Sequence, residues 1–299
     1  NADGRMDFAV GSYGYNPGGA ANTGRAYIFY NDGSIPTTAA TADVIITGNA
    51  TNDEFGIGIT AGDVNADGKT DLIVGAEGYS TSTGRAYIFY NDGSIPTTAG
   101  TADVTITGEA TSNYFGQSLS TGDFNADGTV DLMVGARGNS SNVGRVYLFY
   151  NDGSIPTTAA TSDVYISGSS SISFGISVAR GDVNADGKID IIAGGTGYSS
   201  STGRAYVFYG DGTNNFGTAT CSGSPAACSV NDADVTITGE SSSNFFGRTI
   251  STGDLNADGK VDLVVGAYGY STNTGRTYIF YNDGSIPTTA ATADVILTG

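Results

Sequence analysis

The fold is decided by one stretch, Phe55-Gly-Ile-Gly-Ile-Thr-Ala-Gly-Asp-Val-Asn-Ala-Asp-Gly-Lys-Thr-Asp-Leu-Ile-Val-Gly-Ala76, because versions of it recur along the whole chain. The central phrase, Asp-x-Asn-x-Asp-Gly-x-x-Asp, starts at Asp63, Asp123, Asp182 and Asp254. A fifth copy, without its first two positions, opens the chain at Asn1. Self-similarity at a regular spacing is typical of a repeat architecture. The sequence therefore predicts five repeats in a chain that is a mature product or an excerpt.

Each repeat reads as four short strands separated by turn residues. In the second repeat, the first strand runs from Phe55 into the Asp-rich loop, and the second, 71–76, is apolar on both faces as a buried strand is. The third, 84–90, ends at the turn signal Asn-Asp-Gly-Ser, and the fourth, 103–108, alternates like an edge strand. We expect an all-β fold, a β-propeller of four-stranded antiparallel blades, because about 40 to 60 residues with four strands make one blade.

We expect residues 1–299 to form a single propeller domain whose first blade lacks its first strand. The approximate repeats are 1–48, 49–108, 109–168, 169–239 with an insertion at 210–234, and 240–299. Beyond Gly299 the repeat pattern would continue with a first strand. An open propeller leaves strand edges unpaired, so further blades of a larger ring, or another chain in an array, would have to supply the missing strand.

Composition narrows the function classes. The chain carries 30 acidic and 12 basic residues, for a net charge of −18, and has no His and no Trp. Such an acidic chain is a poor nucleic-acid binder. The absence of imidazole removes the commonest general-base and zinc chemistry, so we expect no enzyme and assign no catalytic residues. No apolar run is long enough for a membrane span.

The Asp-rich loops predict calcium sites. In the second repeat, the side chains of Asp63, Asn65, Asp67 and Asp71 and the backbone carbonyl of Lys69 can converge on one cation, as in the first half of an EF-hand loop. A set of oxygen ligands alone selects Ca²⁺ over Zn²⁺ or Cu²⁺, and Mg²⁺ suits so many protein ligands less well. The flanking sequence alternates as strands do, which excludes an EF-hand itself.

We expect one structural Ca²⁺ per repeat, up to five in all. Solvated acids in a tight Asp-Gly turn are the alternative, but four intact copies favour metal binding. Five ions would bring the net charge from −18 to about −8. The predicted ligand positions are Asn1, Asp3, Arg5 and Asp7; Asp63, Asn65, Asp67, Lys69 and Asp71; Asp123, Asn125, Asp127, Thr129 and Asp131; Asp182, Asn184, Asp186, Lys188 and Asp190; and Asp254, Asn256, Asp258, Lys260 and Asp262.

Phe-Gly, the Asp/Asn loop and Gly-Ala at the end of the second strand resemble the FG-GAP repeat. This repeat builds the β-propeller of integrin alpha subunits and occurs in many bacterial surface proteins. The resemblance covers the whole chain with two departures. The Pro of Gly-Ala-Pro is absent, as in Gly75-Ala-Glu77, and five repeats stand where the integrin ring has seven blades.

Some other features each have a functional interpretation and a purely structural one. Arg180-Gly181-Asp182 spells an integrin-recognition tripeptide, but Asp182 already has a place in a calcium loop. An Arg precedes every third strand, which suits a glycan-binding ring or, as we favour, ion pairs with carboxylates of adjacent blades. These residues are Arg25, Arg85, Arg145, Arg204 and Arg276.

Cys221 and Cys228 lie in the insertion, where a small disulfide would indicate an oxidising compartment and two free thiols are the alternative. Asn49 and Asn139 match the N-glycosylation pattern, which is weak in a Ser/Thr-rich chain.

These observations favour an extracellular or cell-surface, calcium-stabilised propeller that acts as a structural or adhesion module, or that self-associates into a filament. The expected partners are copies of the chain or a surface protein or glycan. A lectin-like or integrin-like ligand-binding module is the alternative. The non-catalytic propeller of an enzyme, as in propeller-bearing phospholipases, is a further one.

Overall fold

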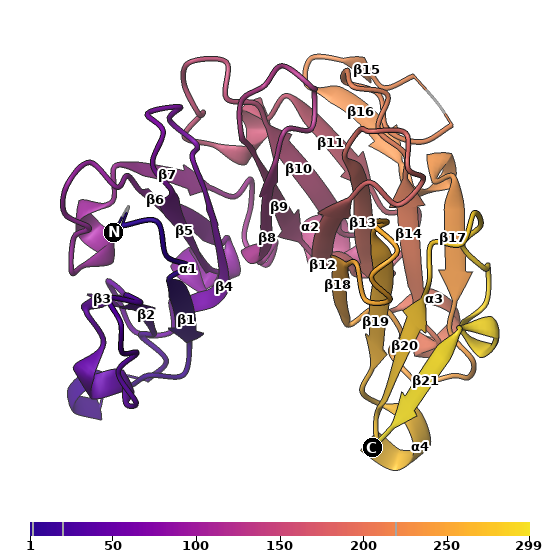
Figure 1. The fold of residues 1–299 in the computed structure, drawn as a ribbon, viewed down its shortest axis with the longest axis horizontal. Coiled ribbons are helices and arrows are strands. Elements are labelled where there is room, and N and C mark those ends of the chain that lie inside the picture. Colours follow the sequence, from indigo (N-terminus) through magenta and orange to yellow (C-terminus); the bar gives the residue numbers. More distant parts are fainter. Residues whose placement is uncertain (2, 20, 219) are drawn as a thin grey trace.

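The structure is a computed structural model that describes residues 1, 3–19, 21–218 and 220–299. In this part of the chain five small sheets follow one another as the blades of a β-propeller (Figure 1). The blades form an open arc, with β1 (Phe8–Ser12) in the blade at one end and β21 (Val295–Thr298) in the blade at the other. The prediction of an all-β propeller is confirmed.

The first blade has three strands, so the prediction that it lacks its first strand is also confirmed. The remaining strands of the five blades, in order, are β2 (Arg25–Phe29) and β3 (Val44–Thr47); β4 (Phe55–Gly62), β5 (Asp71–Ala76), β6 (Arg85–Phe89) and β7 (Val104–Thr107); β8 (Phe115–Gly122), β9 (Asp131–Ala136), β10 (Arg145–Phe149) and β11 (Val164–Ser167); β12 (Phe174–Gly181), β13 (Asp190–Gly195), β14 (Arg204–Phe208) and β17 (Val235–Thr238); and β18 (Thr249–Gly253), β19 (Asp262–Ala267) and β20 (Arg276–Phe280).

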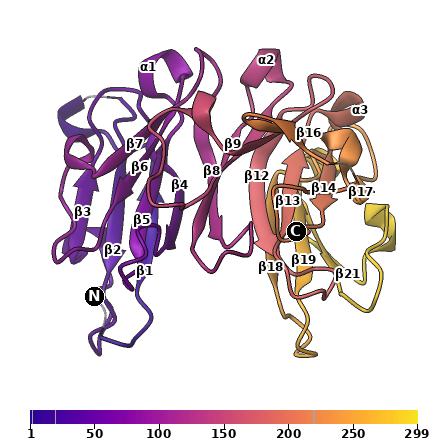
Figure 2. The same cartoon turned by 90° about the horizontal axis from the view of Figure 1, so that it is seen from above.

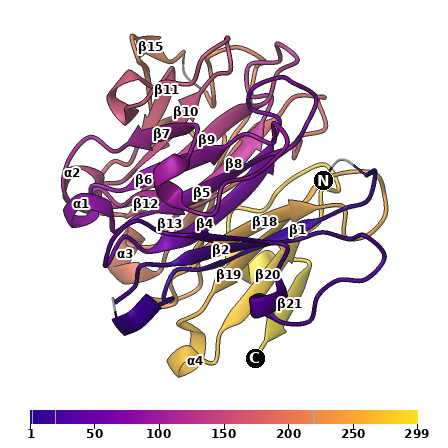
Figure 3. The ribbon, with the colours of Figure 1, turned by 90° about the vertical axis from the view of Figure 1, so that its left-hand side faces the viewer.

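Four single turns of helix connect the second and third strands of blades two to five. They are α1 (Tyr79–Ser82), α2 (Asn139–Asn142), α3 (Tyr198–Ser201) and α4 (Tyr270–Asn273). Seen from the side of the first blade (Figure 3), all four lie on one side of the molecule, and the N terminus lies on the opposite side. The residues in the middle of each turn have left-handed φ angles, such as 49° at Ser80 and 57° at Thr81.

The second strand of each blade lies in the core, as the sequence predicts. All six residues of β5 are buried, because β4 and β6 flank the strand and neighbouring blades cover both faces. Its antiparallel register pairs Leu72 with Phe89 and Val74 with Tyr87. The apolar side chains on both faces therefore hold three blades together.

Glycine sets the distance between blades. A Cβ atom at Gly75 would lie 1.8 Å from the carbonyl oxygen of Gly116 in the next blade, and the same clash arises at Gly11, Gly135 and Gly194. Two backbones thus pass each other with no room for a side chain. The glycines of Phe-Gly and Gly-Ala are consequently the two halves of one contact between blades.

The Phe of Phe-Gly fills the space beside this contact. Phe115 is fully buried and packs in one cluster with Ala86, Ile88 and Ile106 of the preceding blade. Its ring meets Tyr147 of its own blade edge-on at 5.5 Å. Each such Phe therefore joins two blades, and Phe55, Phe174 and Phe246 are equally buried.

The third sheet departs from the four-strand prediction. It has six strands, because β15 (Ser222–Gly223) and β16 (Ala226–Ser229) of the insertion join its outer edge. The strand β16 runs parallel to β11 and pairs Ser229 with Ser167. Elsewhere the corresponding contact is a single bridge, as between Thr47 and Thr98, so the insertion lengthens a contact that other blade pairs also make.

Within the described residues, no helix has the length and apolar character that crossing a bilayer requires.

We expect Gly75→Ala to destabilise the chain by about 3 kcal/mol or more, because its Cβ would meet the backbone of the next blade and neither can move without the other. Thermal unfolding measured by circular dichroism checks this. Gly253→Ala is the matched control, since a Cβ there meets nothing within 4 Å. Equal melting temperatures for the two variants would contradict the proposed role of the glycine contact.

Candidate metal centres

The Asp-rich loops join the first and second strands of the blades. In Figure 2, α1, α2 and α3 lie on one side of the molecule and the N terminus, which belongs to the first loop, lies on the other. The four intact loops occupy 63–71, 123–131, 182–190 and 254–262. They begin one residue after strands β4, β8, β12 and β18 and end on the first residue of β5, β9, β13 and β19.

Short side chains shape each loop through bonds to its own backbone. The Asp67 N–H donates to Oδ1 of Asp63 and to Oδ1 of Asn65, both at 3.0 Å, and the Gly68 N–H donates to Oδ2 of Asp63 at 2.8 Å. Ala66 and Gly68 adopt left-handed φ angles of 59° and 85°, which turn the chain back on itself. The same bonds recur in the other three intact loops. The oxygens of the first two ligand positions therefore lie close together in every copy.

The last Asp of each loop is buried and ties three segments together. Asp71 accepts the Val64 N–H on Oδ2 at 3.0 Å and the Asn91 N–H on Oδ1 at 2.9 Å. These bonds connect the loop, the start of β5 and the turn after β6. The equivalent residues Asp131, Asp190 and Asp262 make the same two bonds.

Burial raises the pKa of three of these acids, Asp71, Asp131 and Asp190. Burial, reinforced by the nearby charges of Asp127 and Asp123, raises the pKa of Asp131 to about 6. Burial likewise raises the pKa of Asp190 to about 6, with Asp186 and Asp182 adding to the effect. A divalent cation in the loop would offset this repulsion and favour the charged carboxylate.

The loops have the donor chemistry and spacing for Ca²⁺. The side chains predicted as ligands would all bind an ion through oxygen atoms. In the second repeat, the Asp63, Asn65 and Asp67 side chains accept hydrogen bonds only from backbone N–H groups of the loop, and Asp67 also pairs with Lys69. In the part of the chain that the structure describes, however, no three His, Cys, Asp or Glu side chains are grouped closely enough to hold an ion. Calcium binding at the predicted positions thus stays a prediction.

The incomplete copy at the N terminus keeps part of the turn. Asn1 Oδ1 accepts the Asp3 N–H at 3.1 Å, and Asp3 Oδ1 accepts the Arg5 N–H at 2.9 Å. Asp7 accepts the Asn31 N–H at 2.7 Å, the counterpart of the bond between Asp71 and the Asn91 N–H in the second repeat.

At the seventh loop position the side chains differ while the backbone stays the same. The N–H groups of Lys69, Thr129, Lys188 and Lys260 each donate to the Asp two residues earlier, at 2.8 to 2.9 Å. The contribution of the carbonyl oxygen at this position to an ion stays a prediction.

The five Arg residues before the third strands stack on aromatic rings. The Arg85 guanidinium lies 3.7 Å from the centre of the Tyr79 ring, and its Nε donates to Thr107 on the outer strand at 3.1 Å. All five make both kinds of contact. Only Arg145 and Arg276 pair with carboxylates, Glu109 and Glu240, among the described residues. For Arg25, Arg85 and Arg204 the expectation of ion pairs is therefore wrong, because their guanidinium groups stack on tyrosine rings instead.

Two minor motifs are constrained by their surroundings. The Asp182 carboxylate of the Arg-Gly-Asp tripeptide accepts the N–H groups of Asp186 and Gly187, so it faces its own loop. Asn139 is buried with its amide donating to Tyr147 at 3.1 Å, whereas Asn49 is exposed. Of the two glycosylation candidates, Asn49 is the one we propose.

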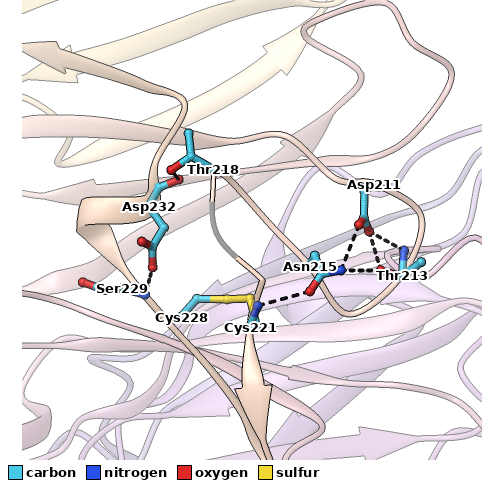
Figure 4. Close-up of a disulfide and its surroundings, with 8 residues drawn as sticks. All are labelled: Asp211, Thr213, Asn215, Thr218, Cys221, Cys228, Ser229 and Asp232. Carbon is cyan, nitrogen blue, oxygen red and sulfur yellow. Dashed lines mark hydrogen bonds between the residues drawn. A yellow bond between two sulfur atoms is a disulfide. The ribbon is translucent and has the colours of Figure 1, made fainter.

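The insertion contains a disulfide between Cys221 and Cys228 (Figure 4). Both residues are buried in one cluster with Ile166 of the third blade and Phe208 of the fourth. The disulfide thus lies where two blades meet. Asn215 accepts the Cys221 N–H at 3.1 Å and so fixes the loop that leads to it. Neither cysteine is a free thiol in the structure.

Comparison with known proteins agrees with this architecture. A model of the FG-GAP repeat matches residues 55–89, 115–149, 174–208 and 246–280, each match running from the Phe of Phe-Gly to the last Phe of the third strand. The chain therefore carries a match to the FG-GAP repeat in four of its blades.

Two relatives illustrate the likeness. The chain is 29% identical to human phosphatidylinositol-glycan-specific phospholipase D over 239 residues, which is 71% of this chain and 26% of the relative. It is 29% identical to integrin alpha-5 of Xenopus laevis over 234 residues, which is 73% of this chain and 20% of the relative. The match thus covers a minor part of each relative, one a phospholipase and the other an integrin.

A solved structure, the Vibrio cholerae biofilm matrix protein Bap1, aligns at a TM-score of 0.31 and 14% identity, covering 81% of this chain and 38% of that protein. A likeness this remote carries no argument about function.

We expect Asp123→Asn to lower the number of bound Ca²⁺ ions by one, because the variant removes one carboxylate at the first position of the third blade's loop. Isothermal titration calorimetry measures this number. Asp152→Asn is the matched control, since it makes the same change of charge in an exposed turn of the same blade. Equal stoichiometry in the two variants would contradict the assignment of this loop.

We expect Cys221→Ala with Cys228→Ala to destabilise the insertion by about 2 to 3 kcal/mol, the entropic value for a loop this short. Hydrogen exchange should then accelerate in β16, which depends on the insertion, and stay unchanged in β5. Ser222→Ala, an exposed change in the same loop, is the control. Unchanged exchange in β16 would show that the disulfide does not hold the insertion in place.

Proposed function

We propose that this chain is an extracellular, calcium-stabilised propeller module with a structural or adhesive role and no catalytic activity. The observation that carries the proposal is the recurrence of one oxygen-rich loop in four blades, each ending on a buried Asp that joins three segments. A catalytic centre is normally built once, whereas a stabilising site suits repetition. The buried disulfide supports an oxidising compartment.

In each intact loop the ion would be held by the side chains at the first, third, fifth and ninth positions and by the carbonyl at the seventh. When bound, Ca²⁺ supplies positive charge that offsets the repulsion among the loop acids. The turn bonds of this chain hold the loop backbone in shape beforehand, and the ion would then bring the carboxylates together. Low-affinity loops of this kind suit a medium with millimolar calcium.

Self-association into a filament or array is the finer part of this proposal. It is supported by the repetition of one surface along the propeller. The turn segments 30–38, 90–98, 150–158 and 281–289 have the same nine residues, so the propeller presents the same surface four times.

We expect EGTA to lower the melting temperature by more than about 10 °C relative to 2 mM Ca²⁺. A site at 20 times its dissociation constant contributes about 1.8 kcal/mol, and four sites act together. Circular dichroism measures the melting, and light scattering on the same samples measures the mass.

The variant Asp63→Asn, Asp123→Asn, Asp182→Asn and Asp254→Asn should melt alike with and without Ca²⁺. The control Asp32→Asn, Asp92→Asn, Asp152→Asn and Asp283→Asn makes the same charge change in the hairpin turns and should keep the full calcium response. A calcium-independent melting temperature in the unmodified chain would overturn the stabilising role. A monomeric mass at every concentration would overturn self-association.

A further inference from the structure

Two blades hold a carboxylate against the Arg that precedes their third strand. Nη1 of Arg145 donates to both carboxylate oxygens of Glu109 at 3.1 and 3.2 Å, and Nη1 of Arg276 donates to both oxygens of Glu240 at 3.0 Å. Each Glu is the second residue after the outer strand of the preceding blade. The packing of two blades thus places a guanidinium where it can bind a carboxylate through charge-assisted hydrogen bonds.

The second and fourth blades have the same Arg but no carboxylate beside it. The position of Glu109 is taken by Asn49 in the contact with Arg85 and by Ser169 in the contact with Arg204. Both residues are exposed, and both Arg side chains are partly accessible. Over the described part of the chain, neither guanidinium forms an ion pair. The place of the Glu carboxylate is therefore open to a carboxylate from outside the chain.

The unpaired guanidinium groups are held in the same way as the paired ones. Arg204 lies 3.5 Å from the centre of the Tyr198 ring, and its Nε donates to the outer strand of its own blade at 2.9 Å. The corresponding distances for Arg276, which binds Glu240, are 3.5 and 3.0 Å. A side chain fixed from two directions loses little further freedom when it binds an anion, so the site is preorganised.

The surroundings of Arg204 favour a sugar as the carrier of the carboxylate. Tyr198, which stacks on Arg204, opens the turn α3, and the exposed residues Ser199 and Ser200 follow it directly. The second blade has the same arrangement in α1. One guanidinium beside several hydroxyl groups matches a uronic acid, which carries one carboxylate and several hydroxyl groups.

We propose that Arg204 and Arg85 are binding sites for the carboxylate of an acidic sugar, which takes the position that Glu109 and Glu240 have in the other two blades. Both sites lie on the side of the propeller that carries α1 and α3 (Figure 3). Two sites on one face would let a chain of such sugars bind more tightly than a single unit.

The two sites differ in strength. The buried carboxylate of Asp53 lies near enough to Arg85 to interact with its charge, whereas the corresponding residue beside Arg204 is Ile172. An acid near the guanidinium weakens its attraction for a second carboxylate. Arg204 is thus the stronger site.

This inference supplies a ligand for the adhesive role proposed above, but it does not depend on calcium or on self-association. The metal loops and these Arg residues belong to different parts of each blade. The sugar site can therefore fail while calcium still stabilises the chain, and the reverse.

Nuclear magnetic resonance of the full chain with Ca²⁺ present tests the proposal, with methyl β-D-glucuronide as the probe. The Nε–H group of Arg204 donates to Thr238, so it is protected from exchange with water and gives a signal that Arg204→Lys identifies. We expect this signal to shift saturably with the glucuronide. Methyl β-D-glucoside, which has the same ring without the carboxylate, should leave it unchanged. The Arg85 signal should shift only at higher concentrations.

Exchanging residues between the two kinds of blade gives matched variants. Ser169→Glu places a carboxylate of the chain beside Arg204 and should weaken glucuronide binding there at least about tenfold. Glu109→Ser should free Arg145 and add its signal to those that respond. Ser154→Glu adds the same charge in an exposed turn of the third blade and should leave binding unchanged.

The outcomes separate the proposal from its rivals. An Arg204 signal that ignores the glucuronide, that shifts equally with the glucoside, or that still responds after Ser169→Glu would overturn the carboxylate site. N-acetylglutamate N-methylamide presents a carboxylate on a peptide unit. If it bound as tightly as the glucuronide, the assignment of the ligand to a sugar would be wrong.

Discussion

The approach of two glycine backbones between neighbouring blades is the contact on which this structure depends. Gly75 and Gly116 leave no room for a Cβ, and that closeness brings Phe115 into the core of the preceding blade. The Phe-Gly and Gly-Ala pairs, far apart in each repeat, therefore form one interface. Because every interface is alike, stability accrues blade by blade, as in other repeat proteins.

The first strand of each blade links this interface to the candidate metal loop. The strand β8 begins at Phe115, in the preceding blade, and ends at Gly122, next to the first loop acid Asp123. Eight residues thus separate the apolar contact on one side of the propeller from the carboxylates on the other. An ion that orders the loop would also fix the end of the strand that carries the Phe. The repeat places these two features on one strand, which accounts for their joint recurrence.

Local patterns in the sequence were enough to predict the repeats, the strands and the turns of the loops. The alternation and the Asp-Gly turns are encoded within a few residues, and the structure agrees at β5 and at the turn bonds of Asp63. Calcium itself stays a prediction, because the acids bond backbone groups here and their convergence depends on an ion.

Features that depend on distant contacts were missed or predicted wrongly. The strand β16 joins a neighbouring sheet in parallel, and nothing within the insertion indicates which edge it would meet. The Arg residues were expected to face acids, yet Arg85 stacks on Tyr79, six residues earlier, because a left-handed turn brings that ring back over the strand. The burial of Asn139 was likewise not predictable, because a glycosylation motif in the sequence does not indicate whether its Asn is exposed.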